Sequence, residues 1–165
     1  MSKETLRISG IVEESIVDGR GIRYVIFTQG CPHRCPGCQN PATHDFAGGR
    51  VVETASLLPD ILADPMLRGV TFSGGEPFCQ AAALTELAKE IRARSKLDIT
   101  VFTGYTWEEL QTLPGAQELL EQTDVLIDGR FVEGEKDLTL QFRGSRNQRI
   151  IDVPRSLAAG EVCLL

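Results

Sequence analysis

The sequence lacks several features that would assign it to a broad class at once. None of its 165 residues belongs to an apolar run of about 18 or more, the length that a membrane-spanning helix needs. The opening stretch MSKETLRISG has no apolar core of the kind found in secretory signals. Repeats, low-complexity tracts and charged tails are also missing. We therefore expect a single domain over residues 1–165 that works in the cytoplasm without a membrane partner.

Basic residues are also in short supply. The chain has 17 Lys and Arg against 23 Asp and Glu, which gives a net charge of -6. Nucleic-acid binding needs a basic field to neutralise phosphates, so this balance disfavours a general nucleic-acid partner. The five cysteines are an odd number, and three of them are too crowded to form disulfides with one another. A reducing compartment, with thiols available for metal, is the expectation.

The chain does contain alternating strand and helix patterns. Segments rich in β-branched and aromatic residues predict strands at residues 6–12, 22–28, 69–73, 97–102 and 124–128. Apolar periodicity and capping residues predict helices at residues 54–63, 80–95, 107–113 and 116–122. This alternation indicates an α/β fold with a mostly parallel sheet. A closed eight-stranded barrel takes about 250 residues, so we predict a partial, laterally open (β/α) barrel.

Three cysteines fall within the short run CPHRCPGC, at Cys31, Cys35 and Cys38. Structural zinc sites normally use four protein ligands, whereas a 4Fe-4S cluster held by three thiolates keeps one iron open for a small molecule. The spacing therefore favours an iron-sulfur site with an open position. Two alternatives remain: a zinc site completed by His33 or His44, and cysteines that bind no metal.

A glycine-rich turn, Gly74-Gly75-Glu76, follows the predicted strand at residues 69–73. It is not a phosphate-binding P-loop, because the pattern G-x-x-x-x-G-K-[ST] is absent. Backbone without side chains lets a ligand approach closely and offers acceptors for an ammonium group. The cysteine run also follows a predicted strand, so both motifs are expected at the carboxyl ends of strands, where α/β proteins place functional loops.

The motifs together resemble a known family. The stretches DGRGIRYVIFTQGCPHRCPGCQNPATHDF and FSGGEPF resemble radical S-adenosylmethionine (radical SAM) activating enzymes. The segments VFTGYTWEEL, DVLIDGRFVEGEKDL and FRGSRNQRIIDV narrow the resemblance to the activators of anaerobic ribonucleotide reductase. The resemblance covers nearly the whole chain. It implies that the open barrel is of the radical SAM type.

The resemblance also implies a set of cofactor ligands. Cys31, Cys35 and Cys38 would bind three irons of a 4Fe-4S cluster, and S-adenosylmethionine would chelate the fourth. The methionine amino group would be received by the motif Gly74, Gly75 and Glu76. The adenosine would lie against the backbone of Gly37, Cys38 and Gln39.

The activity that the resemblance implies is the reductive cleavage of S-adenosylmethionine to a 5'-deoxyadenosyl radical. That radical would generate a glycyl radical on the large subunit of anaerobic ribonucleoside-triphosphate reductase, and the electron would come from flavodoxin or a similar reductant. Two other functions stay open. One is activation of a different glycyl-radical enzyme, such as pyruvate formate-lyase, and the other is a non-enzymatic zinc-binding adaptor.

Several further residues are candidates for supporting roles. Asp18 belongs to the loop DGRG, where Arg20 replaces a proline that is usual in the family, and it is a candidate for lining the site. Three arginines, Arg143, Arg146 and Arg149, lie within one short segment. This segment is either a solvated basic loop or a contact for the ligand carboxylate or an acidic partner surface, with Arg143 as the candidate.

The remaining cysteines and two aromatic residues are assigned to packing. Cys79 and Cys163 are expected to be small apolar side chains rather than ligands. Tyr105 and Trp107 are expected to pack beside the site instead of lining it.

Overall fold

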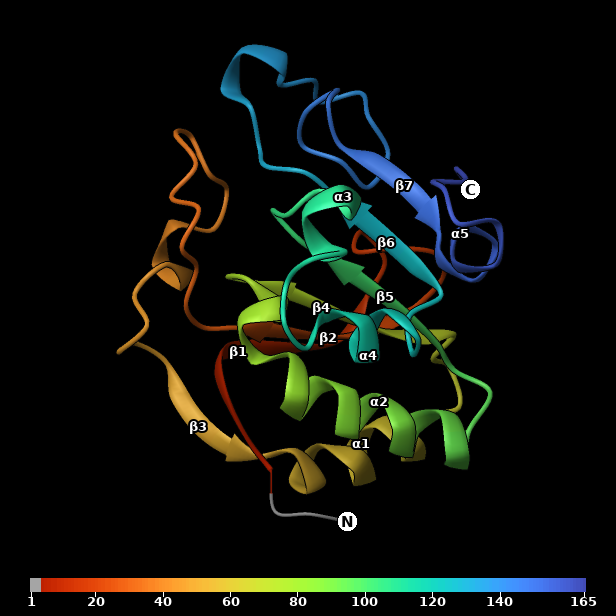
Figure 1. Ribbon diagram of the computed structural model, residues 1–165. Coiled ribbons are helices and arrows are strands. Elements are labelled where there is room, and N and C mark those ends of the chain that lie inside the picture. The colour runs from red at the N-terminus through yellow and green to blue at the C-terminus, as the bar shows by residue number, and fades with distance from the viewer. Residues whose placement is uncertain (1–3) are drawn as a thin grey trace.

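One seven-stranded sheet organises the molecule. The computed structural model describes residues 4–165. The strands are β1 (Thr5–Ser15), β2 (Arg23–Thr28), β3 (Arg50–Glu53), β4 (Gly69–Gly74), β5 (Asp98–Phe102), β6 (Val125–Asp128) and β7 (Arg149–Asp152). Their order across the sheet is β3-β1-β2-β4-β5-β6-β7 (Figure 1). The sheet is therefore open, with β3 at one edge and β7 at the other.

The sheet is mixed. Strands β2, β4, β5 and β6 are mutually parallel, whereas β1 pairs antiparallel with β2 and β3, and β7 pairs antiparallel with β6. The prediction of a mostly parallel sheet thus holds only for the four central strands. A parallel crossover needs a dozen or more residues, and residues 16–22 between β1 and β2 are too few, so the chain turns back on itself there.

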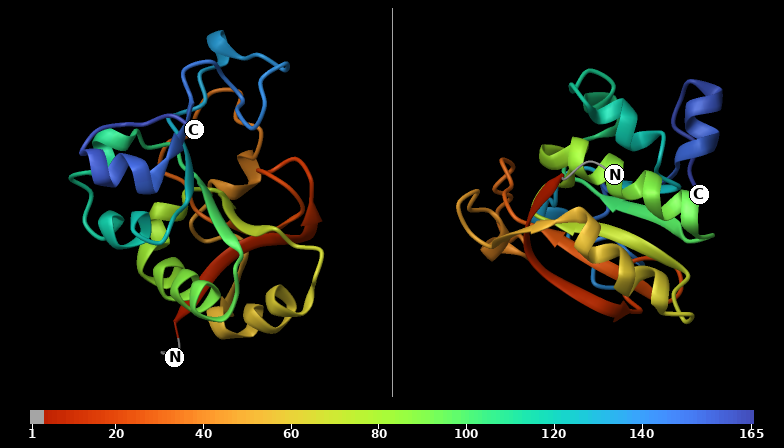
Figure 2. Two further views of the ribbon diagram at one scale, coloured as in Figure 1. Left: turned by 90° about the vertical axis from the view of Figure 1, so that its right-hand side faces the viewer. Right: turned by 90° about the horizontal axis from the view of Figure 1, so that it is seen from below.

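Short helices connect the strands. They are η1 (Pro41–Thr43), η2 (Thr54–Leu57), α1 (Leu58–Ala63), η3 (Pro77–Gln80), α2 (Ala81–Arg94), α3 (Trp107–Leu110), α4 (Ala116–Leu120), η4 (Glu133–Glu135) and α5 (Val153–Ala159). The apolar stripe predicted for the longest of them is buried at Ala83, Leu84, Leu87, Ala88 and Ile91. Helices α1, α2 and α4 lie together along one side of the sheet (Figures 1 and 2).

The two faces of the sheet have different chemistry. Side chains alternate along a strand, and one set, represented by Ile26, Phe72, Val101 and Leu126, forms the buried core under the helices. The alternate set on β2, β4, β5 and β6 includes charged and polar residues: Arg23, Thr71, Ser73, Asp98 and Thr100. This second face is only partly apolar. The cavity described below lies on it, at the carboxyl ends of the central strands.

No helix within residues 4–165 combines the length and the apolar character that crossing a bilayer requires.

Candidate functional site

A cavity of about 400 Å³ opens where the central strands end. Its floor includes the last residues of β4, β5 and β6, represented by Ser73, Phe102 and Ile127. In the left view of Figure 2, the loop after β2 (orange) and the segment between β6 and β7 (blue) come together at one end of the molecule, and both contribute to the cavity wall. Cavities of this size suit small-molecule ligands.

The three clustered cysteines all line this cavity. Cys31 is buried, whereas Cys35 and Cys38 are partly exposed. The loop that carries them, residues 31–38, begins at a fixed point because Cys31 N–H donates to the carbonyl of His44 at 3.1 Å. Burial raises the pKa of the Cys31 thiol above its ordinary value, and the backbone N–H of His33 partly opposes this shift. Metal binding at Cys31 therefore displaces a proton.

We call residues 31–38 the cysteine loop. Within residues 4–165, no three His, Cys, Asp or Glu side chains are gathered closely enough to hold a single metal ion. His44 lines the cavity, but His33 is committed elsewhere, because its Nε2 lies 2.6 Å from Oε1 of Glu76. The zinc alternative completed by either histidine has no preformed site in the described residues.

The glycine turn lies directly beside the cysteine loop. Gly75 N–H donates to the carbonyl of Thr28 at 2.8 Å, which joins the ends of β4 and β2. A β-carbon added at Gly74 would lie 2.4 Å from the Thr28 nitrogen, and one added at Gly75 would lie 2.4 Å from the Gly30 oxygen. Only glycine allows these two strand ends to approach so closely. Gly74 and Gly75 consequently expose backbone in the cavity wall.

Glu76 lies behind this wall and is fully buried. Its carboxyl group accepts hydrogen bonds from the N–H of Phe78, the hydroxyl of Thr103 and the N–H of Gly104, at 2.8 to 3.0 Å. Nε2 of His33 is also within hydrogen-bond distance of this carboxyl group, 2.6 Å from Oε1. The Glu76 side chain is therefore occupied within the protein, so acceptors for a ligand in this motif come from the backbone of Gly74 and Gly75.

The predicted adenosine contacts are only partly brought to the cavity. Cys38 and Gln39 line it, but Gly37 does not. Gly37 has φ +73, and its α-carbon faces Glu133 so closely that an added β-carbon would lie 2.9 Å from Cδ of that side chain. Asp18, from the loop between β1 and β2, lines the cavity, and its carboxylate accepts from the Ser15 hydroxyl at 2.6 Å.

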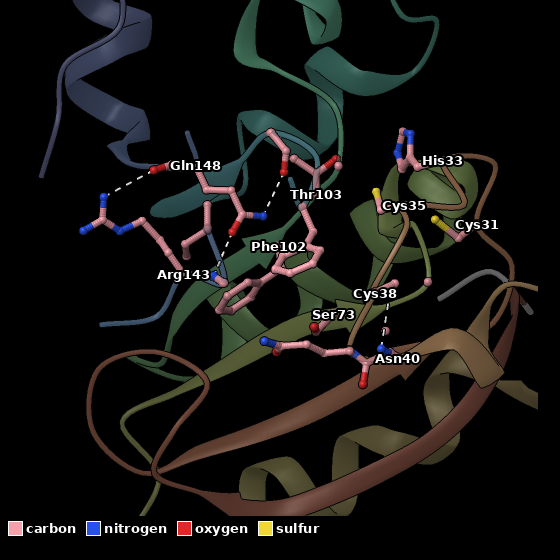
Figure 3. A pocket seen from close by; sticks show the side chains of 18 of the residues that line it. Cys31, His33, Cys35, Cys38, Asn40, Ser73, Phe102, Thr103, Arg143 and Gln148 are labelled. Carbon is pink, nitrogen blue, oxygen red and sulfur yellow. Dashed lines mark hydrogen bonds between the residues drawn. The ribbon is translucent and has the colours of Figure 1, made fainter. Parts of the chain in front are cut away.

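The three arginines of the last segment have separate roles. Arg143 lines the cavity, and its Nε is buried with no hydrogen-bond partner among the described residues. Arg149 donates from Nε to Asp128 at 3.1 Å and also pairs with Glu108 at 2.8 Å, so it links β6 and β7 to α3. Arg146 is exposed. Of the three arginines, only Arg143 lines the cavity, and its Nη1 donates to the carbonyl of Gln148 at 3.3 Å (Figure 3).

Phenyl rings line the cavity as well, at Phe102, Phe131 and Phe142. The sequence reasoning did not single them out. Phe102 ends a predicted strand, so alternation along that strand was the one available signal for it. Phe131 and Phe142 lie in irregular segments with no periodicity. The aromatic rings provide flat apolar surface for stacking against a heteroaromatic ligand.

The packing assignments agree with the structure for the two aromatic residues but not for Cys79. Trp107 is buried in the core, and Tyr105 packs edge-on against the ring of His33, with centroids 4.6 Å apart. Cys79 and Cys163 do not line the cavity, but Cys79 is exposed and Cys163 is partly exposed, so neither is a buried apolar side chain. Partial burial, followed by the nearby Glu76 charge, raises the pKa of the Cys79 thiol to about 11, which keeps it protonated at neutral pH.

Comparison with known proteins gives consistent results. The family described as "4Fe-4S single cluster domain" matches residues 17–151. An anaerobic ribonucleoside-triphosphate reductase-activating protein from Vibrio cholerae is 36% identical over 143 residues, which covers 82% of this chain and 90% of that protein. Proteins with the same description from Escherichia coli and from Enterobacteria phage T4 are 36% and 35% identical, each over 81% of this chain and over 90% and 86% of their own lengths.

A more distant likeness exists among solved structures. The crystal structure of QueE from Escherichia coli matches with a TM-score of 0.46 and 17% identity, over 75% of this chain and 70% of that chain. We draw nothing from a likeness at this level.

The cavity with three thiols and the matching family define the class of this protein as a 4Fe-4S single cluster domain. Within that class, the chain belongs to the family of anaerobic ribonucleoside-triphosphate reductase-activating proteins. The resemblance to the activators of anaerobic ribonucleotide reductase, noted in the sequence, is thereby confirmed.

The residues around the cavity fit a 4Fe-4S cluster. Three thiols on one loop supply the donor chemistry of an iron-sulfur cluster. Across the cavity lies Arg143, a guanidinium whose Nη1 donates to the carbonyl of Gln148 and whose buried Nε has no partner among the described residues, and guanidinium groups suit carboxylates. Figure 3 shows Cys31, Cys35 and Cys38 on one side, Arg143 and Gln148 on the other, and Phe102 between them.

Proposed function

We propose that this protein reductively cleaves S-adenosylmethionine at a 4Fe-4S cluster held by Cys31, Cys35 and Cys38. The product radical would generate a glycyl radical on the large subunit of anaerobic ribonucleoside-triphosphate reductase. The whole chain, residues 1–165, would act as one radical SAM activase domain in the cytoplasm, with flavodoxin or a similar reductant as electron donor. The open sheet would serve as a partial barrel whose uncovered side meets the large partner.

One observation carries the proposal. The three cysteines line the same cavity as the exposed backbone of Gly74 and Gly75 and the unpartnered Nε of Arg143. When bound and reduced, the cluster supplies the single electron that breaks the sulfonium bond of S-adenosylmethionine. Backbone acceptors and a guanidinium donor are complementary to the amino and carboxylate groups of the same amino acid.

The chain's own residues have three tasks in this proposal. The cysteines bind iron as thiolates, and the loop that carries them fixes their spacing. Gly74 and Gly75 leave room for the ligand, and Arg143 orients its carboxylate. The phenyl rings of Phe102, Phe131 and Phe142 provide an apolar wall that limits water at the site of the reaction. None of these tasks requires side-chain acid–base catalysis.

Anaerobic reconstitution tests the proposal directly. Protein rebuilt with iron and sulfide is expected to be brown and, once reduced, to convert S-adenosylmethionine into 5'-deoxyadenosine and methionine. Incubation with the large reductase subunit should then produce a glycyl doublet in electron paramagnetic resonance. Colourless protein that binds one equivalent of zinc and cleaves nothing would favour the adaptor. Cleavage with a doublet on pyruvate formate-lyase alone would favour the other activase.

Arg143 provides a separate test of the ligand site. The variant Arg143→Met keeps a long unbranched side chain but removes the guanidinium, both its partnerless Nε and the Nη1 that donates to the carbonyl of Gln148. Hydrogen bonds to charged groups contribute enough that the Kd for S-adenosylmethionine should rise roughly tenfold or more. Equilibrium dialysis with reconstituted protein measures this constant. The exposed neighbour Arg146 supplies the control Arg146→Met, and equal constants in the two variants would remove Arg143 from the site.

A further inference from the structure

His33 joins the cysteine loop to the body of the protein. Its Nε2 lies 2.6 Å from Oε1 of Glu76, and both side chains are almost fully enclosed, with exposures of 5% and 0%. The Glu76 carboxyl group already accepts two backbone N–H groups, so the imidazole N–H is assigned as the donor. Within the part of the chain that the structure describes, this is the only hydrogen bond from residues 32–37 to residues outside the cysteine loop.

Glu76 is itself rigidly held, so it is a fixed anchor for the loop. It caps η3 by accepting from the N–H of Phe78 at 3.0 Å. It also accepts from the hydroxyl of Thr103 and from the N–H of Gly104, which follow β5. One carboxyl group therefore ties together the ends of β4 and β5 and the cysteine loop.

The surroundings of His33 are built to admit its ring. A β-carbon added at Gly104 would lie 2.4 Å from Cδ2 of His33, so the ring fills the space that a side chain at this position would occupy. Tyr105 contacts the ring edge-on, with an interplanar angle of 81°. Figure 3 places His33 on the same side of the cavity as Cys31 and Cys35. A glycine, an aromatic edge and a buried acceptor thus all converge on one imidazole.

We propose that His33 is a positioning residue, which locks the cysteine loop onto the ends of β4 and β5 through Glu76. The lock holds Cys31 and Cys35 at a fixed place relative to the backbone of Gly74 and Gly75. The lock itself is inferred from the contacts of His33. Its consequence rests on the proposed function: the lock would keep the open iron of the cluster at a fixed distance from the backbone acceptors for the ligand amino group. Glu76 acts here through His33 and does not touch the ligand.

Four variants test the lock. His33→Ala removes the ring, and His33→Gln restores an N–H donor of similar reach. Gly104→Ala leaves His33 and Glu76 in place but puts a methyl group where the ring lies. Arg34→Ala is the matched control, because Arg34 is an exposed residue of the same loop.

Hydrogen exchange of the cofactor-free protein is the first measurement. Loss of a buried hydrogen bond to a carboxylate should increase the exchange rate of amides in residues 32–38 roughly tenfold in His33→Ala and in Gly104→Ala. His33→Gln should recover most of the protection, and Arg34→Ala should match the unmodified protein. Since Gly104→Ala acts only by displacing the ring, it should have little further effect when combined with His33→Ala.

The second measurement uses reconstituted protein. Each variant should assemble a 4Fe-4S cluster, but His33→Ala and Gly104→Ala should bind S-adenosylmethionine roughly tenfold more weakly than the control. The reduced cluster should also show a smaller change in its electron paramagnetic resonance spectrum when the ligand is added. Urea unfolding of each variant provides a control for overall stability. If a variant unfolds at the same urea concentration as Arg34→Ala but shows the smaller spectroscopic change, the change cannot come from lower stability of the fold.

Two outcomes would overturn the inference. One is loop exchange and ligand affinity in His33→Ala and Gly104→Ala that equal those of Arg34→Ala. The other is full additivity of the two substitutions, which would show that Gly104 does not act through the ring. If the unmodified protein fails to cleave S-adenosylmethionine, the proposed function fails, while the exchange experiment still decides whether the lock exists.

Discussion

Replacement of Cys31, Cys35 or Cys38 by alanine is expected to abolish cleavage of S-adenosylmethionine. Each substitution removes one thiolate from a site that has three, and iron then lacks a protein ligand at one corner of the cluster. Reconstituted variants should contain less iron and sulfide, lack the broad visible absorption, and produce no 5'-deoxyadenosine above the reagent blank. Chromatography of the reaction mixture and iron analysis of the protein measure both effects.

The chain contains its own controls for this experiment. Cys79 and Cys163 do not line the cavity, so neither is placed to bind the cluster there. Cys79→Ala and Cys163→Ala should therefore keep the cluster and the cleavage activity. Full activity in any one of the three cavity variants would contradict the ligand assignment, because the proposed site has no spare cysteine.

The parts of the fold that the sequence predicted are those whose pattern is local. Helix α2 was predicted from apolar residues at three- and four-residue steps, and it buries that stripe. The central strands β2, β4, β5 and β6 were predicted from short β-branched runs, and all four are present. In each case one segment contains enough residues to reveal the period of its structure.

Helix α5 and two strands were not predicted, and the two missed strands are the elements that depend on neighbours distant in the sequence. Strands β3 and β7 have four residues each, which is too short to show a period, and they are strands because β1 and β6 pair with them. The antiparallel direction of β1 was available in principle, since residues 16–22 cannot form a crossover. Edge strands of this length change a sheet from mostly parallel to mixed.

The candidate site divides in the same way. The spacing of the three clustered cysteines was enough to predict that they belong to the site. The glycine pair after a strand was enough to predict exposed backbone at Gly74 and Gly75. The direction of the Glu76 side chain was not predictable, because it depends on donors from His33, Thr103 and Gly104. Motif reasoning places a residue near a site, but tertiary hydrogen bonds decide which way its side chain points.

Arg23 is the clearest case of a residue whose role its sequence context hides. A charged residue at the start of a strand is ordinarily exposed, yet Arg23 is fully buried, with an exposure of 0%. Its Nε donates to Thr71 at 2.7 Å, and the other guanidinium nitrogens reach the carbonyls of Arg20 and Val70 and the carboxylate of Asp98. The partners come from β4, β5 and the loop after β1, so no local pattern signals them.

The substitution Arg23→Met is therefore expected to be strongly destabilising. It keeps an unbranched side chain of similar length but leaves Asp98 without its buried partner and several acceptors unsatisfied. Breaking a fully buried ion pair by removing one partner costs about 3–5 kcal/mol. The Asp98 side chain is 22% exposed and also pairs with Arg68, so we expect a loss of about 2–3 kcal/mol, still a large part of the roughly 5–15 kcal/mol that stabilises a typical domain. Urea unfolding of the cofactor-free protein, followed by circular dichroism, measures the free energy of unfolding.

Two further variants separate the ion pair from simple packing. Arg23→Lys keeps a positive charge, but an ammonium group cannot present the guanidinium fork to several acceptors at once, so most of the loss should remain. Arg23→Met combined with Asp98→Asn should cost less than the sum of the two single changes, because the second removes a charge that the first leaves with only the more exposed Arg68, 3.6 Å away. A loss below about 1 kcal/mol for Arg23→Met would mean that the buried network contributes little.

The effects of the Arg23 substitutions should reach the cavity through the loop after β1. The hydroxyl of Thr71 accepts from Arg23 and donates to the carbonyl of Asp18 at 2.8 Å, so the guanidinium supports the loop that brings Asp18 to the cavity wall. Loss of Arg23 should therefore speed amide exchange in residues 16–22 as well as lower overall stability. Protection in this loop that stays unchanged while stability falls would show that Arg23 holds the sheet but not the edge of the site.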